Sequence, residues 1–363
     1  MKSWVLCALV LLAMLASGCT AGPAAPSAPA TGAQLLAPTV AQTAISAPAL
    51  TAAPRPPTPT LTPASIAPVA PTRISWRALT EAAPGAPLRH LISLAVAPDG
   101  ALWVGSDNDG VFRYDGVSWR QYTDADGLAD NSINSIAIGP DGAVWVATWF
   151  GASRLEGERW RTYPFERDFV GNDYHPLAIG PEGQVWVGGG RGLLRLEGET
   201  WTPALADAEL AALPALALLA DPDGALWAAV GLRGLYRAQD HAAEPVGPAP
   251  LPQGLRVRAL LAAPDRTLWM ATSHGLYRYA QGAWETPAEG LPEGYVTSLA
   301  LAPDGALWLG THGQGLMRYD GQRTQRYTVA DGLPASEVYA VAVDREGVVW
   351  AATASGLAYG ESR

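Results

Sequence analysis

Cysteine is almost missing from this chain of 363 residues, because its two cysteines, Cys7 and Cys19, both lie within the first 19 residues. The rest of the sequence therefore has no disulfide framework and no thiolate metal site. Lysine is scarcer still, since Lys2 is the only one, and the net charge is −10. An acidic chain without a basic run is poorly suited to nucleic acid or to an anionic lipid surface, so we expect neither as a partner.

The apolar run Trp4–Leu15 is too short to cross a bilayer but suits the core of a signal peptide. Small residues and then Cys19 follow, and this ending resembles a bacterial lipobox, in which the cysteine becomes the first mature residue and carries lipid. Ala16 stands where the lipobox usually has leucine, so cleavage without lipidation, giving a soluble secreted protein, is the alternative. We predict a lipoprotein signal peptide over residues 1–18 and an extracytoplasmic protein, lipid-anchored at Cys19 without crossing the membrane. Thr20, rather than aspartate, points to the outer membrane by the same resemblance.

Charge and large apolar groups are nearly missing from residues 20–72, where alanine, proline and threonine dominate. Such a segment cannot bury a core. Proline-rich chains favour extended polyproline II, which rises about 3.1 Å per residue. We therefore predict that residues 19–72, from the lipidated cysteine onward, form a disordered linker that holds the next domain on the order of 100 Å from the membrane.

Phenylalanine is rare, with 4 residues, whereas tryptophan is over-used, with 14. Seven tryptophans follow a Pro-Asp-Gly-like phrase, and successive ones lie 39 to 42 residues apart. They are Trp103, Trp145, Trp186, Trp227, Trp269, Trp308 and Trp350. A period near 40 with strand-like content indicates a propeller or an array.

One repeat, residues 92–124, reads ISLAVAPDGALWVGSDNDGVFRYDGVSWRQYTD and divides into four strand-length pieces. Pro-Asp-Gly suits the first turn and Asp-Gly suits a hairpin between the last two pieces. Four antiparallel strands make one propeller blade. The sequence therefore predicts an all-β fold over residues 73–363, a seven-bladed β-propeller of four-stranded antiparallel blades.

The seventh copy ends with GLAYGESR and lacks a fourth strand, whereas RISWRALT at 73–80 parallels VSWRQYTD at 117–124. We predict that this N-terminal strand completes the last blade and closes the ring. Closure of this kind removes the free sheet edges that invite aggregation.

The repeated phrases PDGALWVG and GLxRYDG, together with Asp-Gly-Leu at 126–128 and 331–333, resemble the two-component-regulator propeller repeat from residue 74 to about 359. In many members such blades form the extracytoplasmic sensor of a hybrid histidine kinase, often tuned to polysaccharide fragments. This sequence shows no transmembrane helix, Ig-like module or kinase after the propeller. If the chain senses a ligand, we expect another protein to transmit the signal.

Comparing the seven copies separates scaffold from candidate site, because positions alike in all copies are needed by every blade. The arginines that recur in the third strand of six copies, such as Arg113, are therefore expected to pair with carboxylates at blade edges. Positions leading into the innermost strand, and those between the second and third strands, are diverse and should meet at one mouth of the channel. There an aromatic pair would suit stacking on a sugar ring. The candidate ligand-binding residues are Trp149, Phe150, Asp173, Tyr174, His175, Arg191, Arg233, Arg256, Arg258, His274, Tyr295, His312, Glu337 and Tyr339.

No catalytic or metal-binding motif accompanies these residues. The histidines have no ligand spacing, and Asp107-Asn108-Asp109 lacks the distal glutamate of a calcium loop. We expect no cofactor and no metal, and a monomeric, non-enzymatic protein that recognises an extracellular small molecule, glycan or envelope protein on one propeller face.

One alternative function is a structural docking hub of an envelope complex. Another is a metal-dependent lyase, because streptogramin lyases share the PDG-x-LW phrase, although they typically continue with Phe-Thr. Only His274, His312 and Glu337 would offer such a site.

Overall fold

The computed structural model describes residues 74–83, 86–166, 169, 175–231, 233–246, 255–285, 291–292 and 294–362. These belong to one unit, which spans Ile66–Arg363. The predicted signal peptide, the predicted linker with Cys19, and the candidate residues Asp173 and Tyr174 lie outside the described residues. No helix within the described part of the chain is long and apolar enough to span a bilayer.

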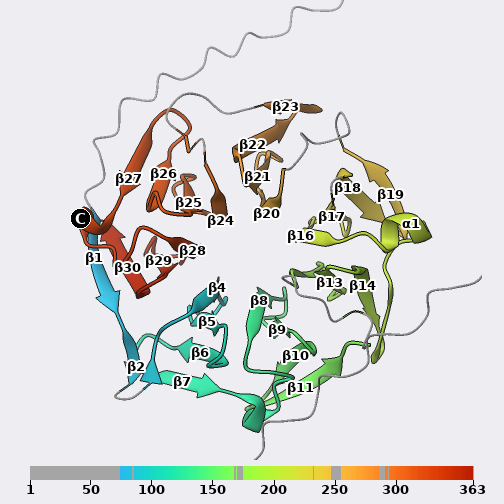
Figure 1. Cartoon of the computed structure of the whole chain (residues 1–363), viewed down its shortest axis with the longest axis horizontal. Coiled ribbons are helices and arrows are strands. Elements are labelled where there is room, and N and C mark those ends of the chain that lie inside the picture. Colours follow the sequence, from blue (N-terminus) through green and yellow to red (C-terminus); the bar gives the residue numbers. More distant parts are fainter. Residues whose placement is uncertain are drawn as a thin grey trace, which may run out of the picture. The chain divides into compact units, whose positions relative to one another are not determined.

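The described chain forms seven four-stranded antiparallel sheets, in chain order from β4 onward (Figure 1). Blade 1 is β4 (Leu91–Val96), β5 (Leu102–Ser106), β6 (Val111–Tyr114) and β7 (Trp119–Tyr122). Blade 2 is β8 (Ile133–Ile138), β9 (Val144–Thr148), β10 (Gly151–Glu156) and β11 (Arg159–Pro164). Blade 3 is β12 (Leu177–Ile179), β13 (Val185–Gly189), β14 (Gly192–Glu197) and β15 (Thr200–Pro203). Blade 4 is β16 (Ala215–Ala220), β17 (Leu226–Val230), β18 (Gly234–Gln239) and β19 (Ala242–Pro245).

Blades 5 to 7 continue the series. Blade 5 is β20 (Val257–Ala262), β21 (Leu268–Thr272), β22 (Gly275–Ala280) and β23 (Ala283–Glu285). Blade 6 is β24 (Val296–Leu301), β25 (Leu307–Thr311), β26 (Leu316–Tyr319) and β27 (Thr324–Tyr327). Blade 7 is β28 (Val338–Val343), β29 (Val349–Thr353), β30 (Gly356–Ser362) and β1 (Ile74–Leu79). Short elements between blades are the hairpin β2 (Glu81–Ala83) with β3 (Ala86–Pro87), the 3-10 helices η1 (Asp124–Asp126) and η2 (Val329–Asp331), and α1 (Ala208–Ala211).

The innermost strands meet all the way round the centre. Contacts join β4 to β8, β8 to β12, β12 to β16, β16 to β20, β20 to β24, β24 to β28, and β28 back to β4. The predicted seven-bladed, all-β propeller is therefore confirmed. Six of the seven second strands are buried at every residue, because each blade packs between two neighbours.

The N-terminal strand closes the ring, as predicted. Strand β1 pairs antiparallel with β30, and Trp76 lies opposite Gly360. The Trp76 ring packs edge-on against Trp308 and Tyr327 of blade 6, with centroids 6.2 and 5.5 Å away. A Cβ at Gly360 would stand 2.9 Å from the Trp76 ring, so glycine leaves the room that the tryptophan fills.

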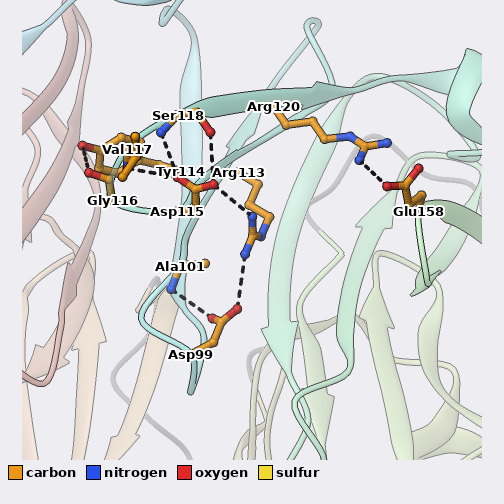
Figure 2. A network of polar contacts seen from close by, with 10 residues as sticks. All are labelled: Asp99, Ala101, Arg113, Tyr114, Asp115, Gly116, Val117, Ser118, Arg120 and Glu158. Atoms are coloured by element: carbon orange, nitrogen blue, oxygen red, sulfur yellow. Dashed lines mark hydrogen bonds and ion pairs between the residues drawn. The ribbon is translucent and has the colours of Figure 1, made fainter.

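The aspartate of the Pro-Asp-Gly turn accepts hydrogen bonds both from the turn backbone and from an arginine on the third strand. In blade 1, Asp99 accepts a hydrogen bond from the Ala101 amide at 3.0 Å through one oxygen and from the Arg113 guanidinium at 3.3 Å through the other (Figure 2). The same arginine lies over the Trp103 ring, 5.9 Å from its centroid. Equivalent pairs join Arg154 to Asp141, Arg237 to Asp223, and Arg318 to Asp304.

The two remaining third-strand arginines differ. Arg278 pairs with Glu285 at 3.3 Å, and Arg195 lies over the Trp186 ring with no ion pair among the described residues. The prediction that these arginines pair with blade-edge carboxylates is thus confirmed for five of the six blades that carry them. Their repetition reflects the scaffold rather than a site.

The Pro-Asp-Gly turn of blade 6 also contributes to the acid stability of the fold. Burial alone raises the pKa of Asp304, but the Ala306 amide and the Arg318 guanidinium outweigh it, so the pKa lies below its ordinary value. A lowered folded pKa stabilises the protein above the unfolded pKa of about 3.9, and this contribution is lost as the pH falls through the folded value. We expect the melting temperature to drop below about pH 4. It should drop less steeply in Asp304→Asn, and an unchanged acid slope in that variant would contradict the assignment.

Candidate functional site

A cavity of about 530 Å³ occupies the mouth of the central channel and is lined by residues of all seven blades. It brings together five of the predicted residues. They are Arg258 on β20, Tyr295 just before β24, His312 just after β25, Glu337 just before β28 and Tyr339 on β28. We name this cavity the mouth cavity.

Backbone hydrogen bonds explain why residues from two parts of each blade meet at this mouth. In five blades the turn after the second strand donates an amide to the carbonyl of a residue that leads into the first strand. These bonds are Asp107 to His90, Gly231 to Pro214, Ser273 to Arg256, His312 to Tyr295, and Ala354 to Glu337, at 2.6 to 3.0 Å. Both sets of predicted positions therefore lie on one face, opposite the Pro-Asp-Gly turns.

Four side chains form a continuous polar row across blades 5 to 7. The Arg258 Nε–H donates to the Tyr295 hydroxyl, and the guanidinium lies 5.1 Å from the Tyr295 ring centroid. The Tyr295 ring lies 5.8 Å from the His312 ring, whose Nδ1 is 2.8 Å from Glu337 Oε1. The row offers a cation, an anion and aromatic faces within one cavity, which suits a polar ligand that contains a ring.

His175 departs from the sequence expectation. It is fully buried, stacks on Phe165 at 5.5 Å, and contacts Phe169 at 5.7 Å. Its Nδ1 lies 3.3 Å from the Asn134 side-chain amide. His175 is therefore packed beneath the mouth surface, because Phe165 and Phe169, which follow β11, cover it.

Trp149 is partly buried. Its indole N–H donates to Ser132 Oγ at 2.7 Å, and Ser132 in turn donates to Asp107 at 2.7 Å, which joins blade 2 to blade 1. Its ring contacts His175 edge-on at 5.9 Å. The neighbouring Phe150 is 54% exposed. Of the predicted aromatic pair, Phe150 is thus the ring that a ligand can reach most easily.

The remaining candidates lie on the mouth face but outside the cavity lining. Arg191, Arg233 and His274 are exposed in the turns after the second strands of blades 3, 4 and 5, and Arg256 is exposed just before β20. The sequence analysis placed all of these residues in one group. The structure separates a cavity set from an exposed outer set.

The cavity also contains polar residues outside the predicted set, among them Asn134, Thr297, Ser93 and Ser135. Several of them tie one innermost strand to the next. Ser93 Oγ accepts the Ile136 amide at 3.0 Å, and Thr297 Oγ1 donates to the Val338 carbonyl at 2.6 Å. Thr297 and Asn134 occupy the same repeat position as Arg258 and Tyr339, and this shared position was the signal that could have found them.

The three residues considered for a lyase do not form one cluster of ligands. His312 contacts Glu337, whereas the His274 ring lies 2.9 Å from the Ser273 hydroxyl. Within the described ranges, no group of three or more histidine, cysteine or acidic side chains could hold a metal ion.

A second cavity, of about 660 Å³, lies at the opposite end of the channel, among the Pro-Asp-Gly turns. Its lining includes Pro98, Pro264 and Pro303 together with aliphatic residues, and its polar members are Asp265, Asp344 and Arg345. None of the predicted ligand-binding residues lines it. We name it the turn-side cavity.

A sequence model of the family described as "Two component regulator propeller" matches residues 127–150, 290–313 and 332–355. The second and third of these segments run from the connection before blades 6 and 7 into the turn after their second strand. Three segments of the chain therefore match two-component-regulator propeller repeats. No curated protein matches the sequence.

Solved structures with the same fold include three different kinds of protein. The extracellular domain of the proposed hybrid two component system BT4673 from B. thetaiotaomicron is 21% identical, with a TM-score of 0.63 over 80% of this chain and 40% of its own length. Virginiamycin B lyase from Staphylococcus aureus is 14% identical, with a TM-score of 0.65 over 80% and 99% of the two chains. YCF48 from Cyanidioschyzon merolae is 14% identical, with a TM-score of 0.58 over 79% and 99%. At these identities the likeness establishes the propeller fold.

Proposed function

We propose that this propeller is an extracytoplasmic, non-enzymatic receptor that binds a sugar or a similar small polar ring compound in the mouth cavity. The observation that carries this proposal is the convergence of Arg258, Tyr295, His312, Glu337 and Tyr339 on one cavity of about 530 Å³. Pockets of this size hold small ligands, and a few polar groups beside aromatic faces give them specificity. The extracellular domain of the similar two component system supports an extracytoplasmic place for this chain.

The proposal includes attachment to a membrane through a lipid on Cys19. The first described residue of the propeller, Ile74, lies beside Pro303 and Gly347 in the turns between the first and second strands of blades 6 and 7. Strand β1 runs from there toward the mouth face, where Leu79 pairs with Leu357.

The proposal is tested by thermal melting of the full-length protein with a panel of neutral and acidic mono- and disaccharides. A ligand at about 100 times its Kd stabilises the folded state by about 2.7 kcal/mol. For a domain of this size that amounts to a rise of about 5 °C in the melting temperature. We expect at least one saccharide to produce such a rise.

Two variants show which end of the channel binds the saccharide that raises the melting temperature. Tyr339→Ala in the mouth cavity should abolish the ligand-induced rise, whereas Arg345→Ala in the turn-side cavity should leave it intact. Each variant is compared with its own melting temperature without ligand, so a loss of intrinsic stability does not count. A panel in which no saccharide raises the melting temperature, or a rise lost only in Arg345→Ala, would contradict the proposed function.

A further inference from the structure

Five exposed residues lie in the turns between the second and third strands of five consecutive blades. We name them the mouth arc: Phe150, Arg191, Arg233, His274 and His312, in blades 2 to 6. Because the innermost strands of these blades contact one another in order, the arc follows the rim of the channel. Its blade 6 member, His312, also lines the mouth cavity.

The arc concentrates cationic side chains that the scaffold does not use. Neither Arg191 nor Arg233 has an ion pair among the described residues, whereas five arginines on the third strands pair with carboxylates. The whole chain carries a net charge of −10. Exposed arginines in the turns of neighbouring blades provide cationic groups that can attract an anion.

The arc is connected to the cavity through blade 5. Arg256 is exposed just before β20, and its carbonyl accepts the amide of Ser273, the residue before His274. Two residues further along, Arg258 enters the cavity wall. A series of cationic groups thus runs from inside the cavity at Arg258, over Arg256, to Arg233 and Arg191.

Blade 1 and the connection to blade 2 carry negatively charged side chains at the mouth. In blade 1 the equivalent turn contains Asp107 and Asp109, and Asp130 precedes the first strand of blade 2. These carboxylates are partly exposed. A polyanion is therefore attracted to blades 3 to 5 and repelled from blade 1, which gives a bound chain a direction.

We propose that the ligand of this receptor is an acidic oligosaccharide, with one unit in the mouth cavity and the following units along the mouth arc from blade 5 toward blade 2. This inference rests on the proposed function. Arginine binds carboxylates in a bidentate manner, and an aromatic face stacks on a sugar ring, so Arg233 and Arg191 suit the uronic acid carboxylates and Phe150 suits the ring at the far end.

The test measures how affinity depends on ligand length. Calorimetric titration of the full-length protein uses dimers, tetramers and hexamers of galacturonic and glucuronic acid, with neutral hexoside oligomers of equal length as controls. Two exposed arginine–carboxylate contacts are together worth about tenfold in affinity. We expect the acidic hexamer to bind about tenfold more tightly than the dimer, and this gain to shrink as salt is added.

Matched variants assign the length-dependent gain to the arc. The double variant Arg191→Ala/Arg233→Ala should lose the gain while its affinity for the dimer stays unchanged. The control Arg323→Ala/Arg326→Ala removes the same charge from exposed positions on the β26–β27 hairpin and should keep the gain. The inference is overturned if the arc variant keeps the gain or if the control loses it equally. Hexaglutamate that shows the same length-dependent gain would replace the saccharide class by a charge-only partner.

The outcomes also separate this inference from the proposed function. Binding of neutral saccharides in the cavity without preference for acidic ones leaves the proposed function standing and overturns the acidic ligand. Absence of binding by any saccharide overturns both.

Discussion

Removal of residues 1–80 should abolish cooperative unfolding of the propeller and yield a protein that aggregates. The truncation deletes β1, so the whole length of β30 becomes an unpaired edge, which is a template for pairing with other chains. It also deletes Trp76, which is 8% exposed and packs on Trp308 and Tyr327. Loss of that side chain alone costs about 3–5 kcal/mol, against a total stability of about 5–15 kcal/mol.

The point variant Trp76→Ala isolates the packing from the deletion. Its control is Trp119→Ala, because Trp119 occupies the same position of the fourth strand in blade 1 but is partly exposed. Chemical denaturation should show a larger loss for Trp76→Ala than for Trp119→Ala. A truncated protein that stays monomeric and unfolds at the wild-type denaturant concentration would contradict closure by β1.

Gly315→Ala should be a strongly destabilising single-methyl substitution at the mouth. Gly315 has a φ of +84°, and a Cβ there would stand 2.1 Å from the Tyr327 carbonyl oxygen of the neighbouring strand. Its amide also donates to the Ser336 carbonyl at 2.7 Å. The backbone would have to shift against two neighbours, so we expect a loss of at least about 3 kcal/mol.

Gly321→Ala provides the control for that substitution. Gly321 has a similar φ of +94°, but no atom lies within 4 Å of a Cβ built there. Alanine at this position therefore costs only the left-handed conformation, about 1–2 kcal/mol. Equal losses of unfolding free energy in the two variants would contradict this account. They would show that the turn requires glycine at position 315 because of its backbone conformation and not because β27 approaches closely.

The fold could be predicted from the sequence because each blade repeats the same local chemistry. Pro-Asp-Gly turns, paired arginines and tryptophan-bearing second strands recur at nearly constant spacing, and Asp99 with Arg113 shows why both residues recur together. Closure by the N-terminal strand could be predicted for the same reason. The seventh copy lacked a piece whose counterpart, with Trp76, stood at the other end of the repeats.

The candidate site could be predicted only in part. Repeat positions brought Arg258, Tyr295 and Glu337 to one mouth, since topology alone decides where a strand begins. Burial of His175 depends on Phe165 and Phe169, which lie in a connection without a counterpart in the other blades. The division between cavity and arc depends on how far each side chain reaches, and the repeat pattern does not contain that information.

The most direct test of the mouth site is a crystal structure of the full-length protein with a saccharide that raises its melting temperature. We predict electron density for the sugar between Arg258, Tyr295 and Glu337, with a ring against Tyr295 or Tyr339. Density in the turn-side cavity among Pro98, Pro264 and Pro303, with the mouth cavity empty, would contradict the central claim.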